Sequence, residues 1–294
     1  MLLAGLGQGP AEKGPADIIT PAPAMGSESL DAASMLAVNP IPQEDSRAVK
    51  PILQAKAALL MDVGTGLILY TKNPNERLPM ASLTKIMTAV IIMENHSLDE
   101  VVTVEDSFSG LEGVRMWLRK NEKITVGDLL IGLLVPSAGD AALALARYHS
   151  GSDEAFVNEM NLRARDLGLA DTHFINPIGL DAEGHYSSAY DLAILTQYAL
   201  RFPDFRRIVN TSVATVTSLD GKISHEMHNT NQLLNSYLDI RGVKTGTTDE
   251  AGESLINLAY HPDGHEVITV LLDSPDRFNE SKILIDWAFR NFLW

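Results

Sequence analysis

Strand-like stretches lie near both ends of the chain, and this placement strongly constrains the fold. Residues 55–73, AKAALLMDVGTGLILYTKN, hold two short apolar runs on either side of a DVGTG turn, a pattern typical of a β-hairpin. Residues 242–260 and 266–274 predict two more strands, separated by an Asp-Gly turn. We therefore expect one antiparallel sheet, built from residues 51–75 and 240–294.

Helical patterns fill the region between these strands, about residues 80–235. Residues 86–93 are apolar nearly all round, which predicts a helix buried in the middle of the domain. Residues 152–169 and 187–202 are amphipathic at helical spacing. The closing stretch, residues 281–294, predicts a helix that packs on the sheet, in preference to an anchor at a membrane interface.

Residues 1–50 predict a flexible N-terminal tail or linker ahead of a folded domain at residues 51–294. Six of the fourteen prolines fall in this stretch, and its composition buries too little apolar surface to offset the entropy of ordering. Its start, MLLAGLGQGP, lacks the basic region of an export signal but fits the remnant of a trimmed signal or anchor. No segment has the roughly 18 consecutive apolar residues of a membrane span.

Composition excludes several classes of chemistry. The net charge of −15 argues against a nucleic-acid partner, because a phosphate-binding surface needs an excess of Lys and Arg. The absence of cysteine excludes thiol catalysis, disulfides and cysteine metal sites. The eight histidines follow no metal-binding motif, so we predict neither a metal site nor a cofactor.

Ser82 and Lys85 form the first candidate catalytic pair. They are three residues apart at the start of a predicted helix, so they share one face, and the free N–H groups of the first turn favour developing negative charge there. A serine hydroxyl needs a base to act as a nucleophile, and burial of Lys85 would lower its pKa enough to supply one. The alternative is a capping serine beside a solvated lysine.

The stretch GVKTGTT, residues 242–248, could hold a substrate carboxylate beside a strand. Lys244 offers a positive charge, Thr245 and Thr247 offer hydroxyls, and Gly246 permits close approach of the backbone. The alternative is a polar edge strand whose lysine prevents aggregation.

The stretch PSAGD, residues 136–140, also has two interpretations. Ser137 followed by Asp140 ahead of an apolar run is typical of a helix capping box. The Ser137 hydroxyl could instead take part in chemistry.

In combination the three motifs are far more specific than each alone. S-x-x-K at a helix start, a second serine motif and K-T-G on a strand follow one another in the order typical of penicillin-recognising serine acyltransferases. Residues 52–294 resemble the low-molecular-mass D-alanyl-D-alanine carboxypeptidases, the S11 peptidase family. The resemblance includes LPMASLTKIMTA, GVKTGTTDEAGESL and THFINPIGLDAEGHYSSAYDLA.

The resemblance implies an α+β, β-lactamase/transpeptidase-like fold, with a five-stranded antiparallel sheet flanked by helices and a mostly helical insertion. It implies that Ser82 is the nucleophile that forms the acyl-enzyme, and that Lys85 is its general base. The backbone N–H groups of Ser82 and Thr247 would form the oxyanion hole.

The resemblance also assigns the other two motifs. Ser137 would relay protons between the two motif lysines and the leaving amine. Lys244, Thr245 and Gly246 would bind the terminal carboxylate of the substrate.

Gly139 departs from the family pattern, whose second motif usually reads S-x-N. The missing asparagine normally helps to hold the substrate amide, and loss of such a contact costs about 1 to 3 kcal/mol. We therefore expect reduced or altered activity.

The stretch 154–158, EAFVN, mimics the spacing of a β-lactamase water-activating loop but predicts a solvated helix face. The sequence therefore offers no obvious glutamate to activate water for deacylation, and we expect penicillin to remain bound as a long-lived acyl-enzyme.

The predicted function is a serine D-Ala-D-Ala carboxypeptidase that trims peptidoglycan stem peptides and is inhibited covalently by β-lactams. The alternatives are a D,D-endopeptidase acting on cross-links and a catalytically weakened peptidoglycan-binding module. The family implies an extracytoplasmic location, in the cell envelope. We expect membrane contact only through a missing or trimmed anchor.

Overall fold

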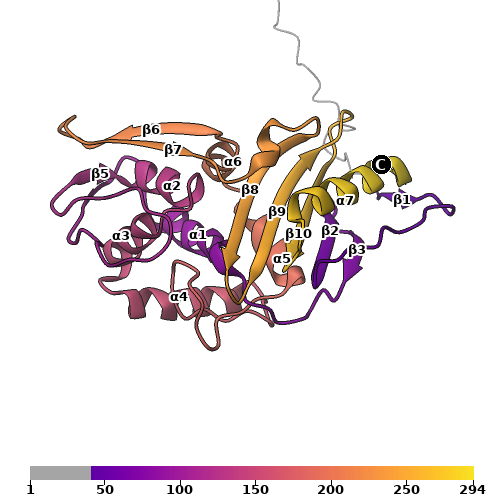
Figure 1. The fold of residues 1–294 in the computed structure, drawn as a ribbon, viewed down its shortest axis with the longest axis horizontal. Helices are drawn as coiled ribbons and strands as arrows, with labels where there is room; N and C mark the ends of the chain where they lie inside the picture. The colour runs from indigo at the N-terminus through magenta and orange to yellow at the C-terminus, as the bar shows by residue number, and fades with distance from the viewer. Residues whose placement is uncertain (1–40) are drawn as a thin grey trace, which may run out of the picture. The chain divides into compact units, whose positions relative to one another are not determined.

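The computed structural model describes residues 41–294, and its centre is a five-stranded antiparallel sheet (Figure 1). The strand order is β3-β2-β10-β9-β8, so the two strands nearest the N-terminus join the three nearest the C-terminus through the β2–β10 pair. The bounds are β2 Ala57–Asp62, β3 Ile68–Lys72, β8 Asp239–Thr248, β9 Gly252–Tyr260 and β10 Glu266–Leu272. The predicted fold class and the predicted origin of the sheet are confirmed.

Both faces of this sheet are covered, which explains why its inner strands are almost wholly buried. Successive side chains of β2 point to opposite faces, so Leu59 joins one apolar cluster and Leu60 the other. Helix α5 (Ala189–Ala199) contacts β2 and β10, whereas α7 (Arg277–Asn291) contacts β9 and β10. Figure 1 shows these helices on opposite faces.

Helix α7 confirms the predicted packing of the C-terminal stretch on the sheet. Its buried side chains include Leu284, Ile285 and Trp287, and the Trp287 ring meets the edge of Tyr70 with centroids 5.8 Å apart. The apolar face of the helix is therefore used inside the domain. Within residues 41–294, no helix is long and apolar enough to cross a membrane.

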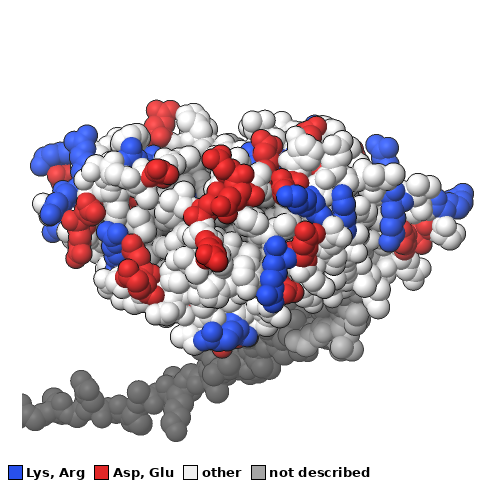
Figure 2. Space-filling model, turned by 60° about the horizontal axis from the view of Figure 1, so that its bottom comes forward, with Lys and Arg blue, Asp and Glu red and all other residues white. Residues whose placement is uncertain are grey.

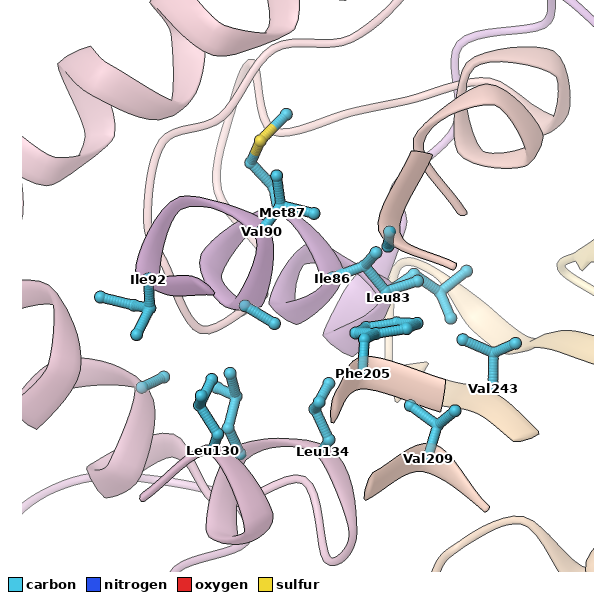
Figure 3. Close-up of a cluster of buried hydrophobic side chains, with 14 of the residues drawn as sticks. Leu83, Ile86, Met87, Val90, Ile92, Leu130, Leu134, Phe205, Val209 and Val243 are labelled. Carbon is cyan, nitrogen blue, oxygen red and sulfur yellow. The ribbon is translucent and has the colours of Figure 1, made fainter. Parts of the chain in front are cut away.

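The helical region is organised around α1 (Lys85–Asn95), as the apolar run at residues 86–93 predicted. Helix α1 contacts α2, α3, α4 and α5, and eight of its residues are buried. Figure 3 shows its side chains packed against Leu130 and Leu134 of α2 and against Phe205 of α6. The bounds are α2 Val126–Leu134, α3 Gly139–Ser150, α4 Asp153–Asp166 and α6 Pro203–Val209.

Short elements complete the described structure. Two hairpins lie within the helical region: β4 (Val101–Thr103) pairs with β5 (Lys123–Thr125), and β6 (Val213–Thr217) pairs with β7 (Ser224–His228). Two 3-10 helices, η2 and η3, span Ala81–Thr84 and Gln232–Asn235.

The predicted tail lies mostly outside the described residues, because residues 1–40 are not described. The last part of the predicted tail is described. There, β1 (Gln43–Glu44) pairs with β11 (Phe292–Leu293). Residues 43–44, which were predicted as part of the tail, thus pair with the C-terminal end of the chain.

Candidate active site

Ser82 and Lys85 meet at the junction of η2 and α1. The Lys85 Nζ donates a hydrogen bond to Ser82 Oγ at 3.0 Å and another to the carbonyl oxygen of Ile178. Lys85 is only 3% exposed, and burial lowers its pKa to about 7, against the opposing effect of the Asp140 carboxylate. A lysine that is partly neutral near pH 7 can accept a proton from the serine hydroxyl.

The backbone before Ser82 is held in an uncommon conformation. Ala81 has a φ of +47°, in the left-handed region that alanine rarely adopts. Its carbonyl oxygen accepts a 2.7 Å hydrogen bond from the Thr84 hydroxyl. Gly179 lies so close to it that a β-carbon at position 179 would collide with the Ala81 carbonyl. Residue 179 must therefore be glycine both for this approach and for its own φ of +86°.

A buried histidine supports this turn, and the sequence did not reveal its role. The Nε2 of His185 lies 2.7 Å from Thr84 Oγ1, and its Nδ1 accepts from the Ile175 N–H at 3.0 Å. Because the Thr84 hydroxyl already donates to Ala81, the imidazole must donate from Nε2, which sets the neutral tautomer. Burial lowers the pKa of His185 to about 4.

Ser137 lines the same cleft, but it is not a helix cap. Helix α3 begins at Gly139 after an N-cap at Ala138 that makes no side-chain hydrogen bond, so the capping-box interpretation is wrong. Ser137 instead adopts a φ of +73°, is 8% exposed, and its Oγ has no hydrogen-bond partner within residues 41–294. A buried, unpaired hydroxyl is costly unless a ligand engages it.

The Asp140 side chain does not cap helix α3 either. Its carboxylate accepts the backbone N–H groups of Met116, Trp117 and Leu118 at 2.8 to 3.1 Å. Asp140 therefore fixes the loop that follows β4, a long-range role that no local motif predicts.

A side chain at position 139 would require its neighbour Leu111 to shift slightly. A β-carbon at position 139 would lie 3.1 Å from Leu111 Cδ2, and the Gly139 N–H donates to the Val114 carbonyl at 2.7 Å. The loop held by Asp140 thus packs directly against Gly139.

Strand β8 borders the cleft on the sheet side. A β-carbon at Gly246 would lie 3.0 Å from Ala81 Cβ and 3.2 Å from the Ser82 nitrogen. The glycine thus permits close approach between β8 and the turn that carries Ser82, rather than approach of a ligand. This contact brings the backbone of Thr247 alongside the turn.

Lys244 and Thr245 are turned toward the protein. Burial, together with the charges of Lys85 and Arg277, keeps the pKa of Lys244 well below its ordinary value. Its Nζ donates to the Thr245 carbonyl at 3.1 Å. The Thr245 hydroxyl pairs with that of Thr230 at 2.6 Å.

Arg277, at the start of α7, is a further cation that sequence reasoning missed. Its Nη1 donates to Thr247 Oγ1 at 2.6 Å and to the Gly246 carbonyl at 2.8 Å. Burial lowers the pKa of Arg277 from its ordinary value, yet a guanidinium stays charged. An anionic substrate group beside Thr247 would therefore meet a half-buried positive charge.

The cleft bordered by Ser82, Lys85 and Ser137 has a volume of about 120 Å³. Of the predicted site residues, Ser82, Lys85, Ser137, Gly139 and Thr247 line it, whereas Lys244, Thr245 and Gly246 do not. Glu112, Ile178 and Gly179 complete much of the wall. In the part of the chain that the structure describes, no group of three or more His, Asp or Glu side chains could hold a metal ion.

Known proteins are similar to this chain in both sequence and fold. A model of the D-alanyl-D-alanine carboxypeptidase family, peptidase family S11, matches residues 44–276. The D-alanyl-D-alanine carboxypeptidase DacF of Bacillus subtilis is 35% identical over 257 residues, which are 85% of this chain and 66% of DacF. A D-alanyl-D-alanine endopeptidase of Pseudomonas aeruginosa is 33% identical over 231 residues, 78% of this chain and 74% of the relative.

A solved structure agrees with this assignment. The Streptomyces K15 DD-transpeptidase superposes with a TM-score of 0.78 at 34% identity, covering 82% of this chain and 99% of that one. The chain spans just under two thirds of the length of DacF. The match of one family model to most of the chain, with this fold, shows that the chain belongs to the D-alanyl-D-alanine carboxypeptidase family, peptidase family S11.

Proposed function

We propose that this protein is a serine-type D-alanyl-D-alanine carboxypeptidase that removes the terminal D-alanine of peptidoglycan stem peptides. The observation that carries the proposal is the 3.0 Å hydrogen bond between Lys85 Nζ and Ser82 Oγ, made by a lysine whose pKa is lowered to about 7. That pair supplies a nucleophile and a base without a metal or a cofactor.

Acylation follows from this geometry. Neutral Lys85 accepts the hydroxyl proton of Ser82 as Oγ attacks the carbonyl carbon of the penultimate D-alanine. The oxyanion accepts hydrogen bonds from the backbone N–H groups of Ser82 and Thr247. The C–N bond then breaks, and the leaving D-alanine amine takes a proton that Ser137 relays from Lys85.

Two features support the remaining roles. The unpaired Oγ of Ser137 lies in the cleft, where a proton relay is required. The Arg277–Thr247 pair places a positive charge and a hydroxyl where they can hold the terminal carboxylate, with Lys244, Thr245 and Gly246 shaping the strand behind them.

Deacylation reverses the first step with water as the nucleophile. Lys85 removes a proton from water, the acyl ester is hydrolysed, and Ser82 is regenerated. A β-lactam acylates the same serine, but its leaving group stays tethered to the acyl moiety. We therefore propose β-lactams as covalent inhibitors.

The same site could act on the D-alanyl bond of a cross-link, as a D,D-endopeptidase. The similarity to the Pseudomonas aeruginosa endopeptidase favours this second candidate. Because Gly139 departs from the family's S-x-N motif, a third candidate is a catalytically weakened module that binds peptidoglycan without turnover. Either peptidase activity implies an extracytoplasmic location, where the substrate lies.

Fluorescent penicillin and a defined peptide test the proposal. The intact chain should be labelled and should release D-alanine from a pentapeptide, whereas Ser82→Ala should do neither. Purified cross-linked muropeptides separate the two peptidases, because only an endopeptidase converts dimers to monomers. Absence of label on the intact, folded chain would exclude the enzyme.

A further inference from the structure

A cavity of about 510 Å³ lies between residues 119–123, which lead into β5, and the turn that joins β6 to β7. A hydrogen bond of 2.9 Å from the Leu219 N–H to the Lys123 carbonyl oxygen joins the two segments. None of the residues that line this cavity lines the catalytic cleft. The cavity is therefore a separate feature of the surface, which the proposed reaction does not use.

Three cations of this cavity have no acidic partner. Arg119, Lys120 and Lys123 line it and are exposed, and none of their side chains makes a hydrogen bond or an ion pair within residues 41–294. Figure 2 shows Lys and Arg side chains at its left-hand end, the end where Figure 1 places β5 and the β6–β7 turn. Uncompensated positive charge is thus gathered here, although the whole chain carries −15.

The two carboxylates of the lining are already engaged. Asp220 forms an ion pair of 3.1 Å with Lys222 and accepts a hydrogen bond of 2.8 Å from the Ser218 hydroxyl. The Glu122 side chain is buried, and its carboxylate lies 2.8 Å from the Nε2 of His225. The charge of the three cations therefore remains available to a ligand.

Phosphate groups suit this set of donors. A phosphate presents its oxygens tetrahedrally, so donors from several directions can reach it at once, whereas a carboxylate presents two oxygens in one plane. The Arg119 guanidinium donates as a fork, and the two lysines act as mobile point charges. Because all three cations are exposed to solvent, one contact gains little, and useful affinity requires an anion with several charges.

The shape of the site favours a flexible polymer over a bilayer. A membrane surface is broad and attracts basic segments that protrude toward it. Here the cations surround a cavity, which a flexible chain can enter and a flat surface cannot fill.

We propose that this cavity binds an anionic polymer whose repeating unit carries a phosphodiester. Arg119 holds one phosphate as a fork, and Lys120 and Lys123 hold the same phosphate or its neighbour. The cavity is thus an attachment surface that has no lining residue in common with the catalytic cleft. It is independent of the proposed peptidase activity.

Fluorescent poly(glycerol phosphate) tests the site, with binding followed by anisotropy at low salt. The intact chain should bind this polymer, and the apparent Kd should rise steeply as potassium chloride is added. Sodium phosphate should compete more strongly than sodium acetate at the same ionic strength, because it occupies the donors as well as screening the charge. No binding at low salt, or equal competition by the two salts, would overturn the proposal.

A triple variant removes the three cations. Arg119→Gln/Lys120→Gln/Lys123→Gln should raise the Kd about tenfold or more, the combined effect of three exposed ion pairs. Its urea unfolding midpoint should match that of the intact chain, since all three side chains are exposed and unpaired.

A second triple variant controls for overall charge. Lys50→Gln/Arg165→Gln/Arg201→Gln also removes three exposed cations, but from other parts of the chain. Its Kd should stay within about twofold of the intact value, because screening limits the reach of distant exposed charges. Equal Kd values for the two triple variants would overturn the proposal.

The opposite change should strengthen binding. The Ser218 hydroxyl and Lys222 lower the pKa of Asp220 to about 2, so this carboxylate is charged at neutral pH. Asp220→Asn removes that charge and frees Lys222, and the Kd should fall severalfold. An unchanged or higher Kd would place the polymer away from this turn and overturn the proposal.

Two further measurements address other binding places. Arg277→Gln should bind the polymer as tightly as the intact chain, and a loss of affinity would place the polymer at the catalytic cleft instead. Vesicles of phosphatidylglycerol and phosphatidylcholine test the bilayer. Tighter binding to these vesicles than to the polymer would reject the polymer in favour of a membrane.

Discussion

The side chain of Leu111 lies against the α-carbon of Gly139, where a β-carbon would be 3.1 Å from Leu111 Cδ2. An apolar side chain from a neighbouring loop therefore packs next to the glycine of the second motif. An asparagine at position 139 therefore requires the Leu111 side chain to move by a few tenths of an ångström.

Gly139→Asn should lower the free energy of unfolding by about 1 to 3 kcal/mol, the usual cost of overpacking a buried site. Adding Leu111→Ala should recover part of this loss and should raise the rate of penicillin acylation above that of Gly139→Asn. Urea unfolding and labelling kinetics measure the two effects. If the single variant is as stable as the original chain, Leu111 does not fill this space rigidly.

Acylation should depend on pH through Lys85. The base is the neutral amine, so the second-order rate of penicillin acylation should rise with pH, about tenfold per unit, up to about pH 7 and then level off. The same profile measured at high salt controls for long-range charge. A rate that does not change across pH 7 would contradict a lysine base with this pKa.

Gly179→Ala should abolish acylation, because the new β-carbon would collide with the Ala81 carbonyl and displace the turn that carries Ser82. Gly184→Ala is the matched control: its φ is +85°, close to the +86° of Gly179, but its β-carbon would have 3.6 Å to the nearest atom. The control should lose about 1 kcal/mol from left-handed strain and should still be labelled. Equal labelling of both variants would remove the proposed role of the close approach.

His185 should make stability fall in mild acid. Its folded pKa of about 4 is below its ordinary 6.5, so the unfolded chain binds the proton first as pH falls. The contribution is complete above about pH 6.5, and by pH 4 roughly 3 kcal/mol of it is lost. Unfolding free energies from pH 4 to 7 should therefore fall less steeply for His185→Gln than for the exposed control His228→Gln.

Arg277→Gln should reduce kcat/KM for D-Ala-D-Ala peptides by about 10- to 100-fold, as expected for loss of a charge-assisted hydrogen bond. A peptide with an amidated C-terminus should be poor for both enzymes, because it lacks the carboxylate. The exposed Arg207→Gln is the control for overall charge. A variant that slows carboxylate and amide peptides equally would place Arg277 outside carboxylate binding.

The parts that local pattern determines could be predicted from sequence. The sheet follows from short apolar runs beside turn residues at both ends of the domain, and the all-round apolar run at residues 86–93 indicated the central helix. The spacing of Ser82 and Lys85 places them on one helical face, so their contact needs little knowledge of the remaining fold.

The other features depend on packing between distant segments. Ser137 and Asp140 match a capping box locally, but the Asp140 carboxylate instead accepts hydrogen bonds from the loop at residues 116–118, and Ser137 adopts a left-handed conformation. Arg277 reaches Thr247 only because α7 begins beside β8. The lowered pKa of Lys244 results from burial and from the neighbouring charges of Lys85 and Arg277, which no local motif encodes.

The sheet joins strands from the two ends of the described chain, and the cleft depends on that closure. A nascent chain that has passed residue 95 already contains Ser82 and Lys85, but Gly246 and Thr247 are not yet synthesised. Contacts between such distant segments form late, because closing long loops is entropically costly. Covalent labelling by penicillin therefore also reports when the site has folded. A ribosome-bound fragment that lacks β8 should stay unlabelled, and the shortest nascent chain that is labelled marks completion of the site.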